Sequence, residues 1–468
     1  MPGSITDVSV SLPSLDAIIR ALTLRAGYNS AVVVISASLL GLAGGAIGTL
    51  TLLRKRALIG DALAHAALPG LATAFLAASA IGANPRSLPI LLGGALVSGV
   101  LAGLAVLLIR MHGRLREDAA IGVVLSVFFG AGIVLLSAIQ SLRHANVAGL
   151  SHFIYGQTAA MNRSDAVLIG AIAVVAFGAA VLLFKEFRVV CFDDRFAAAI
   201  GLNVGLIDLL MLALIVAVII IGLQAVGIIL VVALLIIPAA AARFWTDRMG
   251  GMFALSAVLG ALSGYFGAVA SSLLPRLPAG AVIVLTSGML FVMSMLIAPR
   301  RGVAASALRM LGLRARIACE HFLRGAYEAL EADGDLRAGS AVRLDRIGAA
   351  RGWSSPMRAM VGRLLQSRGL IVPVKAGGAR AWALTERGLT ESARLVRNHR
   401  LWEEYVTTHS SVAASHADFS ADRVEHALSE DIIKELELEL RRRGELPDEP
   451  VERVPASIHT IGPASKAG

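Results

Sequence analysis

Apolar residues fill the first 300 positions of the chain in long runs, and short polar segments separate these runs. A helix needs about 20 mostly apolar residues to cross the hydrocarbon core of a bilayer. The pattern therefore predicts an all-α polytopic membrane domain over residues 29–300. We expect nine spans, at residues 29–53, 57–80, 88–110, 119–140, 165–184, 206–222, 224–242, 250–271 and 279–298.

Local patterns add detail to the membrane domain. The sixth and seventh spans are separated by Gly222–Leu223–Gln224, so they form either a tight hairpin or a broken pair. Residues 1–28 mix apolar residues with charges and predict an interfacial segment rather than a span. One face of the first span is rich in glycine, which allows close helix packing. These glycines are Gly41, Gly44, Gly45 and Gly48.

Charged residues become frequent after about residue 300, and the apolar spacing becomes that of soluble helices. Residues 314–385 predict helices at 317–333, 342–352 and 355–369, the last one capped by Ser355–Pro356. LIVPVKAGGARAWAL then predicts a β-hairpin that turns at Gly377–Gly378. This order predicts a cytoplasmic winged helix, a fold used for DNA binding among other purposes. Residues 386–445 predict a further helical domain, and the Pro-, Ser- and Gly-rich residues 446–468 predict disorder.

Composition and charge fix the class and the direction of insertion. The chain has 56% hydrophobic residues, a mean hydropathy of +0.73 and a net charge of +10. In a membrane protein, basic cytoplasmic loops are a simpler explanation of this positive charge than nucleic-acid binding. One set of connections holds Arg54, Lys55, Arg56, Arg110, Arg114, Arg116, Lys185, Arg188, Arg195, Arg243 and Arg248, and the opposite set holds Arg86, Arg143, Arg163 and Arg276. The asymmetry predicts an inner-membrane protein with its N-terminus outside and everything after Pro299 in the cytoplasm.

An acid and a histidine interrupt the second span. In GDALAHAALPG, Asp61 and His65 are four residues apart and share one helix face. A carboxylate inside a membrane costs at least about 2.5–3.5 kcal/mol, so it requires a cavity or a partner. The pair either locks helices together or forms part of a cation path, and its ligand types suit manganese, iron or zinc. Pro69 breaks the helical hydrogen-bond ladder nearby and frees a carbonyl.

A polar loop segment, VCFDDRFAAAIGLNV, lies on the expected cytoplasmic side. The segment predicts a short amphipathic helix, because apolar and charged residues alternate in it. The apolar residues are Phe192, Phe196, Ile200 and Leu202, and the charged ones are Asp193, Asp194 and Arg195. Such a helix lies at the membrane interface or docks in a groove of a partner. The sequence has no Walker A pattern, G-x-x-x-x-G-K-[ST], so we expect energy from another polypeptide.

Three motifs, in order, resemble the metal-uptake ABC permeases over about residues 25–300. They are GDALAHAALPG, VCFDDRFAAAIGLNV and QAVGIILVVALLIIPAAAAR. The resemblance implies a transport subunit, not an enzyme, that imports manganese, zinc or iron. It implies three partners: an ABC ATPase, an extracytoplasmic solute-binding protein, and a second permease subunit, identical or paralogous. It assigns ATPase docking to Phe192, Asp193, Phe196, Ile200, Gly201 and Leu202.

The tail contains acids and histidines at helical spacing. His399 and Glu403 are four residues apart, and Asp422, Glu425 and His426 share another helix face. Taken alone, such residues usually form a solvated surface. The motifs LTERG, NHRLWE and VEHALS, however, resemble the diphtheria-toxin-repressor family of manganese- and iron-responsive regulators over about residues 317–445.

The repressor resemblance implies two metal sites. One would contain His321, Asp422, Glu425 and His426, and the other would contain His399 and Glu403. A further histidine of the second site is replaced by Asp418 or moved to His416. We expect a tail that senses metal and modulates transport. The alternatives are a membrane-anchored, DNA-binding regulator and a dimerisation module that has lost metal. Manganese is the favoured substrate, with zinc and iron as alternatives.

Overall fold

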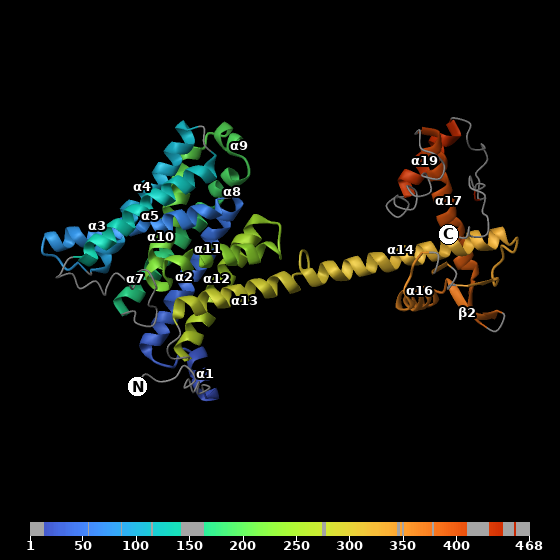
Figure 1. Cartoon of the computed structure of the whole chain (residues 1–468), viewed down its shortest axis with the longest axis horizontal. Helices are drawn as coiled ribbons and strands as arrows, with labels where there is room; N and C mark the ends of the chain where they lie inside the picture. Colours follow the sequence, from blue (N-terminus) through green and yellow to red (C-terminus); the bar gives the residue numbers. More distant parts are fainter. Residues whose placement is uncertain are drawn as a thin grey trace. The chain divides into compact units, whose positions relative to one another are not determined.

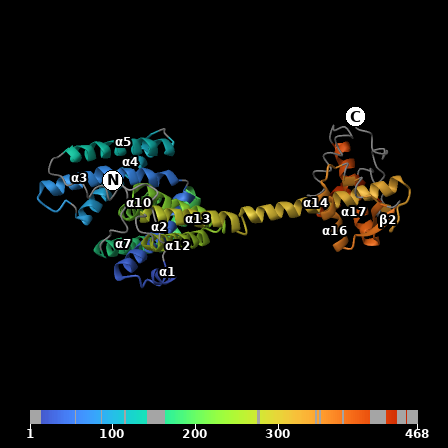
Figure 2. The same ribbon diagram turned by 60° about the horizontal axis from the view of Figure 1, so that its bottom comes forward.

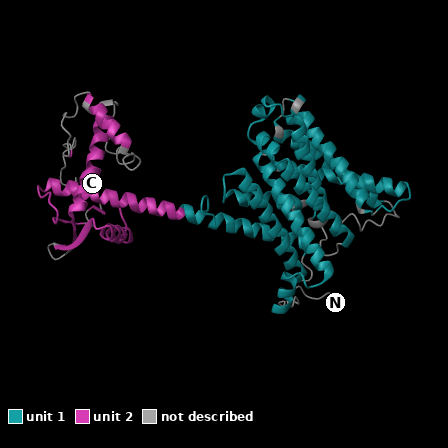
Figure 3. Cartoon of the chain, turned by 180° about the vertical axis from the view of Figure 1, so that it is seen from behind, with its two compact units in different colours: residues 1–306 teal, residues 307–468 magenta. Residues whose placement is uncertain are grey.

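The structure is a computed structural model that describes residues 14–54, 56–85, 87–113, 116–141, 163–273, 278–343, 347–348, 351–376, 379–409, 430–442 and 454. The chain divides into two compact units, residues 1–306 and residues 307–468 (Figure 3). Each unit has a hydrophobic core of its own. The boundary agrees with the change in composition near residue 300.

The first unit is a bundle of helices (Figure 1). Every one of the nine predicted spans is helical, and eight helices of the described chain are long and apolar enough to cross a membrane. The remaining one, α11, has 16 residues and is equally apolar. The helices are α1 (Leu15–Leu22), α2 (Tyr28–Leu53), α3 (Ala57–Ala80), α4 (Leu88–His112), α5 (Glu117–Ser141), α7 (Arg163–Leu182), α8 (Phe184–Phe192), α9 (Asp194–Ala199), α10 (Val204–Val226), α11 (Ile228–Arg243), α12 (Met249–Leu273) and α13 (Ala279–Ile297).

The break between α10 and α11 lies at Gly227, three residues later than Gly222–Gln224, where the sequence placed it. Gly227 has φ of +93°, a conformation that glycine adopts without steric cost. The two helices then fold back on each other, since a Cβ on Gly222 would lie 2.3 Å from the Val231 side chain. The pair is therefore a hairpin with a single-residue turn.

Small residues bring α2 and α12 into backbone contact. A Cβ on Gly41 would lie 2.0 Å from the Gly260 carbonyl oxygen, and one on Gly45 would lie 2.1 Å from that of Ser256. Ser256 Oγ also donates to the Gly45 carbonyl over 2.8 Å. The predicted close packing of this glycine face is confirmed. Around this pair, α3, α4 and α5 lie side by side on one flank (Figure 2).

The second unit combines helices with a small sheet. Its elements are α14 (Val303–Ala332), β1 (Ala341–Val342), α16 (Ser355–Ser367), β2 (Ile371–Ala376), β3 (Ala379–Leu384), α17 (Glu386–His409) and α19 (Glu430–Arg442). The sheet is antiparallel in the order β1-β3-β2, and its hairpin pairs Ala376 with Ala379, in agreement with the predicted turn. Phe322, Leu365 and Leu384 fill the core between helices and sheet.

Two local predictions in this unit were wrong. Val342, placed at the start of a helix, lies in β1 and pairs with Trp382. Its side chain is buried in the core, so tertiary packing decides its conformation. The N-cap of α16 is Ser354 rather than Ser355, and its side chain makes no capping hydrogen bond.

Candidate functional site

Helix α3 places Asp61 and His65 on one face, as their spacing predicts. The His65 Nε2 atom lies 3.6 Å from Asp61 Oδ1. The carboxylate side chain is 45% exposed in this single chain and the imidazole 24%. Both groups therefore belong to an apolar span and yet are accessible from outside the core of the unit.

The imidazole of His65 is held by an aromatic ring. Phe129 of α5 packs edge-on against it, with ring centroids 4.9 Å apart. The Nδ1 atom is buried and has no hydrogen-bond partner among the residues that the structure describes. Because Pro69 lacks an N–H group, it also cannot donate to the His65 carbonyl. The His65 carbonyl therefore lacks its usual helical donor, and the buried Nδ1 atom lacks a partner within the described residues.

Close contacts fix α3 one turn beyond His65. Gly70 meets Gly94 of α4, where an added Cβ would lie 2.2 Å from the carbonyl oxygen. Ser98 Oγ donates to the Ala66 carbonyl over 2.6 Å. Gly132 of α5 approaches Leu68, whose Cβ would lie 2.7 Å from an added Cβ. These contacts leave α3 little freedom to turn the pair away.

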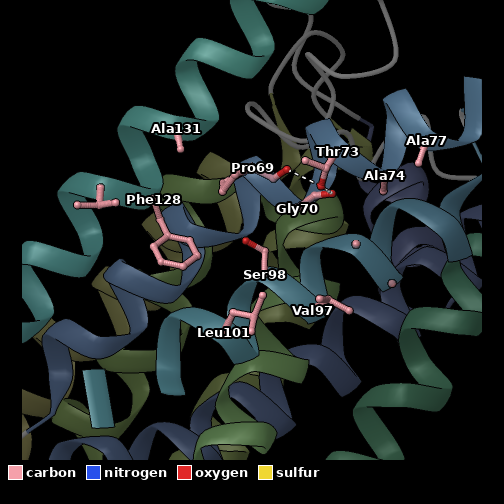
Figure 4. Close-up of a pocket in the computed structure, with 13 residues that line it drawn as sticks. Pro69, Gly70, Thr73, Ala74, Ala77, Val97, Ser98, Leu101, Phe128 and Ala131 are labelled. Atoms are coloured by element: carbon pink, nitrogen blue, oxygen red, sulfur yellow. Dashed lines mark hydrogen bonds between the residues drawn. The ribbon is translucent and has the colours of Figure 1, made fainter. Parts of the chain in front are cut away.

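A cavity of about 570 Å³ opens between α3, α4 and α5 beyond this contact zone (Figure 4). Its walls are apolar apart from Thr73 and Ser98, and Thr73 Oγ1 donates to the Pro69 carbonyl over 2.8 Å. Neither Asp61 nor His65 lines the cavity. Its chemistry suits an apolar side chain rather than an ion.

The segment predicted to dock on a partner forms α8 and α9. Asp193 caps α9 by accepting from the amides of Arg195 and Phe196 over 2.9 Å each. Three large apolar side chains on this segment point outward: Phe192 is 70% exposed, Phe196 55% and Ile200 53%. Gly201 ends α9 with φ of +86°. Leu202, by contrast, packs against the core of the unit and is not part of the exposed surface.

Sequence reasoning missed a buried charge cluster next to this segment. Asp208 of α10 has a side chain that is 3% exposed, and its carboxylate forms ion pairs with Arg54, Arg56 and Arg110. The Arg56 and Arg110 nitrogens lie 3.3 and 3.6 Å from its Oδ2. Arg54 also reaches α9, with Nη1 2.6 Å from Asp194 Oδ1. The signal was present, because Asp208 is the one charged residue in the apolar run from Val204 to Val226.

Some of the metal ligands predicted in the tail lie within the described residues. His321 lies half-buried on α14, and His399 and Glu403 are buried on α17. His399 Nε2 lies 3.2 Å from Glu403 Oε1. Asp422, Glu425 and His426 lie outside the described residues, as do Asp418 and His416. Within the described part of the chain, no group of three His, Cys, Asp or Glu side chains is placed to hold a metal ion.

Comparison with known proteins identifies the membrane unit. Residues 28–298, more than half of the chain, match the ABC 3 transport family. The chain belongs to this family. It is therefore a multi-pass membrane subunit of an ABC transporter and not an enzyme, and ATP hydrolysis resides on a separate subunit.

Individual relatives of this permease agree. It is 36% identical over 403 residues to the manganese transport system membrane protein MntC of Bacillus subtilis, covering 86% of this chain and 90% of that protein. It is 42% identical over 272 residues to the zinc transport system membrane protein TroC of Treponema pallidum, covering 58% and 89%. The solved structure of PsaBC from Streptococcus pneumoniae in complex with Fab has a TM-score of 0.52 and 29% identity, and covers 62% of this chain and 98% of that one.

The tail of the permease has its own relatives. Residues 385–449 match the iron dependent repressor, metal binding and dimerisation domain. The predicted regulator-like character of the tail is confirmed. The Bacillus subtilis alignment also extends into the tail, because 403 aligned residues exceed the 306 residues of the first unit. A tail joined to this kind of permease is therefore shared with that relative.

Proposed function

We propose that the chain is the permease subunit of an importer for a divalent transition metal, and that the ion passes Asp61 and His65. The observation that carries the proposal is a carboxylate 3.6 Å from an imidazole within an apolar span. A hard oxygen and a borderline nitrogen together suit first-row divalent ions. The relatives that transport manganese and zinc support the same substrate class.

The pair replaces part of the hydration shell that the ion loses. Asp61 supplies the negative charge that offsets desolvation, and His65 supplies a nitrogen lone pair held in place by Phe129. Two side chains do not complete a coordination shell, and incomplete coordination suits passage, because a permeating ion must also leave its site. A second permease subunit, identical or paralogous, is expected in the assembled transporter.

Manganese is the metal we favour, with zinc and iron as alternatives. Asp with His suits manganese or iron, and the first relative named above transports manganese. The zinc relative is more identical over a shorter alignment, so sequence likeness alone does not decide. Total cellular metal, measured by mass spectrometry in a deletion strain, tests the choice. A fall in zinc alone would overturn the preference for manganese.

The exposed apolar side chains of α8 and α9 are the proposed docking surface for the ATPase subunit. Phe192, Phe196 and Ile200 project from a segment joined to the bundle through Arg54. An extracytoplasmic binding protein would deliver the ion on the opposite side. This arrangement follows the predicted orientation, with the N-terminus outside and the tail in the cytoplasm.

For the tail we propose metal sensing that modulates transport. The repressor-like match supports this role. The winged helix, with α16 followed by the β2–β3 hairpin, supports DNA binding as a second candidate. Deletion of residues 315–468 separates them: a sensor that modulates transport predicts a changed response of uptake to cytoplasmic metal. Altered gene expression with unchanged uptake would favour the DNA-binding regulator.

The test of the ion path is Asp61→Asn, which removes the charge and keeps the shape of the side chain. We expect uptake of radioactive manganese by cells to collapse while the protein still inserts and assembles. Asp118→Asn, a substitution of an exposed acid near the start of α5, is the matched control and leaves uptake unchanged. Normal uptake by Asp61→Asn would refute the path and favour a pair that locks helices.

A further inference from the structure

The guanidinium group of Arg324 lies next to the imidazole of His399. Arg324 of α14 is 5% exposed, and its Nη1 lies 2.7 Å from His399 Nδ1 on α17. His399 is 3% exposed and Glu403 2%. The position next to this buried histidine and glutamate, where the repressor resemblance implies a metal ion, therefore holds a cation that belongs to the chain itself.

This contact uses the lone pair that a metal would need. The arginine N–H donates, so Nδ1 must accept through its lone pair. The proton of the neutral imidazole then stands on Nε2, which lies 3.2 Å from Glu403 Oε1. A metal binds imidazole through an unprotonated ring nitrogen. Neither nitrogen meets that condition while Arg324 is in place.

The guanidinium group of Arg324 cannot lose its positive charge by deprotonation. Arginine stays charged at every pH a protein tolerates, unlike lysine. A divalent ion at this pair would therefore stand against a fixed positive charge in a buried setting, where like charges repel most strongly. The residues present do not fit a metal ion at this position.

We propose that the positive charge of Arg324 permanently occupies the place of a metal ion at the His399–Glu403 pair. This pair therefore binds no metal ion, and α14 packs against α17 without one. A second ion pair supports the same junction. Arg400 of α17, 4% exposed, donates to Glu331 of α14, with Nη1 3.2 Å from Oε1. The proposal does not depend on the transport function, and it leaves the ligands outside the described residues untouched.

Hydrogen exchange of the full-length protein in detergent tests the metal-free junction. We expect peptides covering residues 395–406 to be equally protected in EDTA and in Mn²⁺. Arg324→Ala should lose this protection under both conditions. Arg316→Ala, which removes a 64% exposed guanidinium group that pairs with Glu320 on the same helix, is the matched control and leaves protection unchanged. Protection that chelation alone removes from the unmodified protein would overturn the proposal.

Metal counting provides a test that does not rely on the folding of Arg324→Ala. Bound Mn²⁺ and Zn²⁺ per chain are measured after gel filtration for the unmodified protein and for Glu403→Gln, which preserves side-chain shape. We expect equal numbers, and His399→Ala should agree. A loss of one ion per chain in Glu403→Gln would show that the pair is a metal site and would refute the proposal.

Discussion

Asp208 is a single carboxylate that faces three guanidinium groups in a buried setting. Asp208→Asn leaves Arg54, Arg56 and Arg110 without this counter-charge. Removing one partner of a buried ion pair costs about 3–5 kcal/mol. We therefore expect a large fall in the melting temperature of the detergent-purified permease.

The control for this change is Asp247→Asn. Asp247 pairs with Arg301, with both side chains about half exposed, 53% and 51%. Exposed pairs contribute about 0–1 kcal/mol, so the melting temperature should barely move. Equal effects of the two substitutions would mean that the buried ion pairs of Asp208 contribute no more to stability than the exposed pair of Asp247.

Cys191 lies on α8 within reach of the same charges. Burial raises the pKa of its thiol to about 11, although the nearby Arg54 acts in the opposite direction. A raised pKa keeps the thiol protonated at neutral pH, and the thiolate is the reactive form. We expect alkylation by iodoacetamide to be slow at pH 7 and to accelerate with each pH unit up to about 11.

A cysteine placed at the exposed position Ala198 on α9 serves as the comparison. Its thiol should react at pH 7–8 at the rate of a free cysteine, whose pKa is about 8.5. Mass spectrometry of the modified peptides measures both sites in one sample. Equal rates at pH 7 would contradict the effect of burial on Cys191.

At the scale of helices, the α2–α12 contact depends on the absence of side chains. Gly45→Ala would place a Cβ 2.1 Å from the backbone oxygen of Ser256, and a backbone atom cannot rotate away. Overpacking of this kind costs about 1–3 kcal/mol, and more where backbone must move. We expect a reduced yield of folded protein and a lower melting temperature.

Gly122→Ala is the matched substitution in another span. A Cβ on Gly122 of α5 meets nothing within 4 Å. Alanine also favours the helix by up to about 1 kcal/mol over glycine, so stability should stay equal or rise. Destabilisation by Gly122→Ala of the size found for Gly45→Ala would show that helix packing is not the cause.

The elements predicted from hydrophobic runs agree with the structure, while their joints differ. Apolar length determines a span almost alone, since every backbone group in a membrane must be paired within the helix. The turn at Gly227 depends instead on contacts such as Gly222 with Val231, which join residues nine apart. Likewise, Val342 lies in a strand because β3 provides the backbone with which it pairs. Neither contact is visible in local periodicity.

At the scale of the whole transporter, the exposed surface of α8 and α9 should govern assembly. Phe196→Ala removes a large apolar side chain that is 55% exposed in the single chain. We expect co-purification of the ATPase subunit to fall at least tenfold, which corresponds to about 1.4 kcal/mol. The melting temperature of the permease alone should not change.

Leu285→Ala provides the comparison for assembly. Leu285 of α13 is 75% exposed but belongs to a candidate membrane span, where we expect lipid to cover it. Its truncation should leave co-purification of the ATPase intact. Loss of the ATPase with Leu285→Ala as well would mean that general damage, rather than the docking surface, explains the result.

The candidate site was predicted in part. Asp61 and His65 were proposed because charge is rare in apolar runs, and the structure confirms that their spacing puts them on one face. The same rarity marks Asp208, which was overlooked because its partners lie far away in the sequence, Arg54 and Arg56 in the connection between α2 and α3 and Arg110 on α4. Arg324 gave no signal, since an arginine on an amphipathic helix is ordinarily a surface residue. Its role depends on His399, 75 positions later.

The glycine contacts of α2 and α12 also have a mechanical consequence. Gly41 meets Gly260 and Gly45 meets Ser256, while Gly264 meets Ala37, so the contact repeats every four residues along both helices. A slide by one residue, about 1.5 Å, would bring larger side chains against bare backbone. We therefore expect the two helices to stay in register in any conformational change of the permease. We expect α2 and α12 to behave as one rigid pair, so that a movement at the proposed path through Asp61 and His65 shifts other helices against this pair.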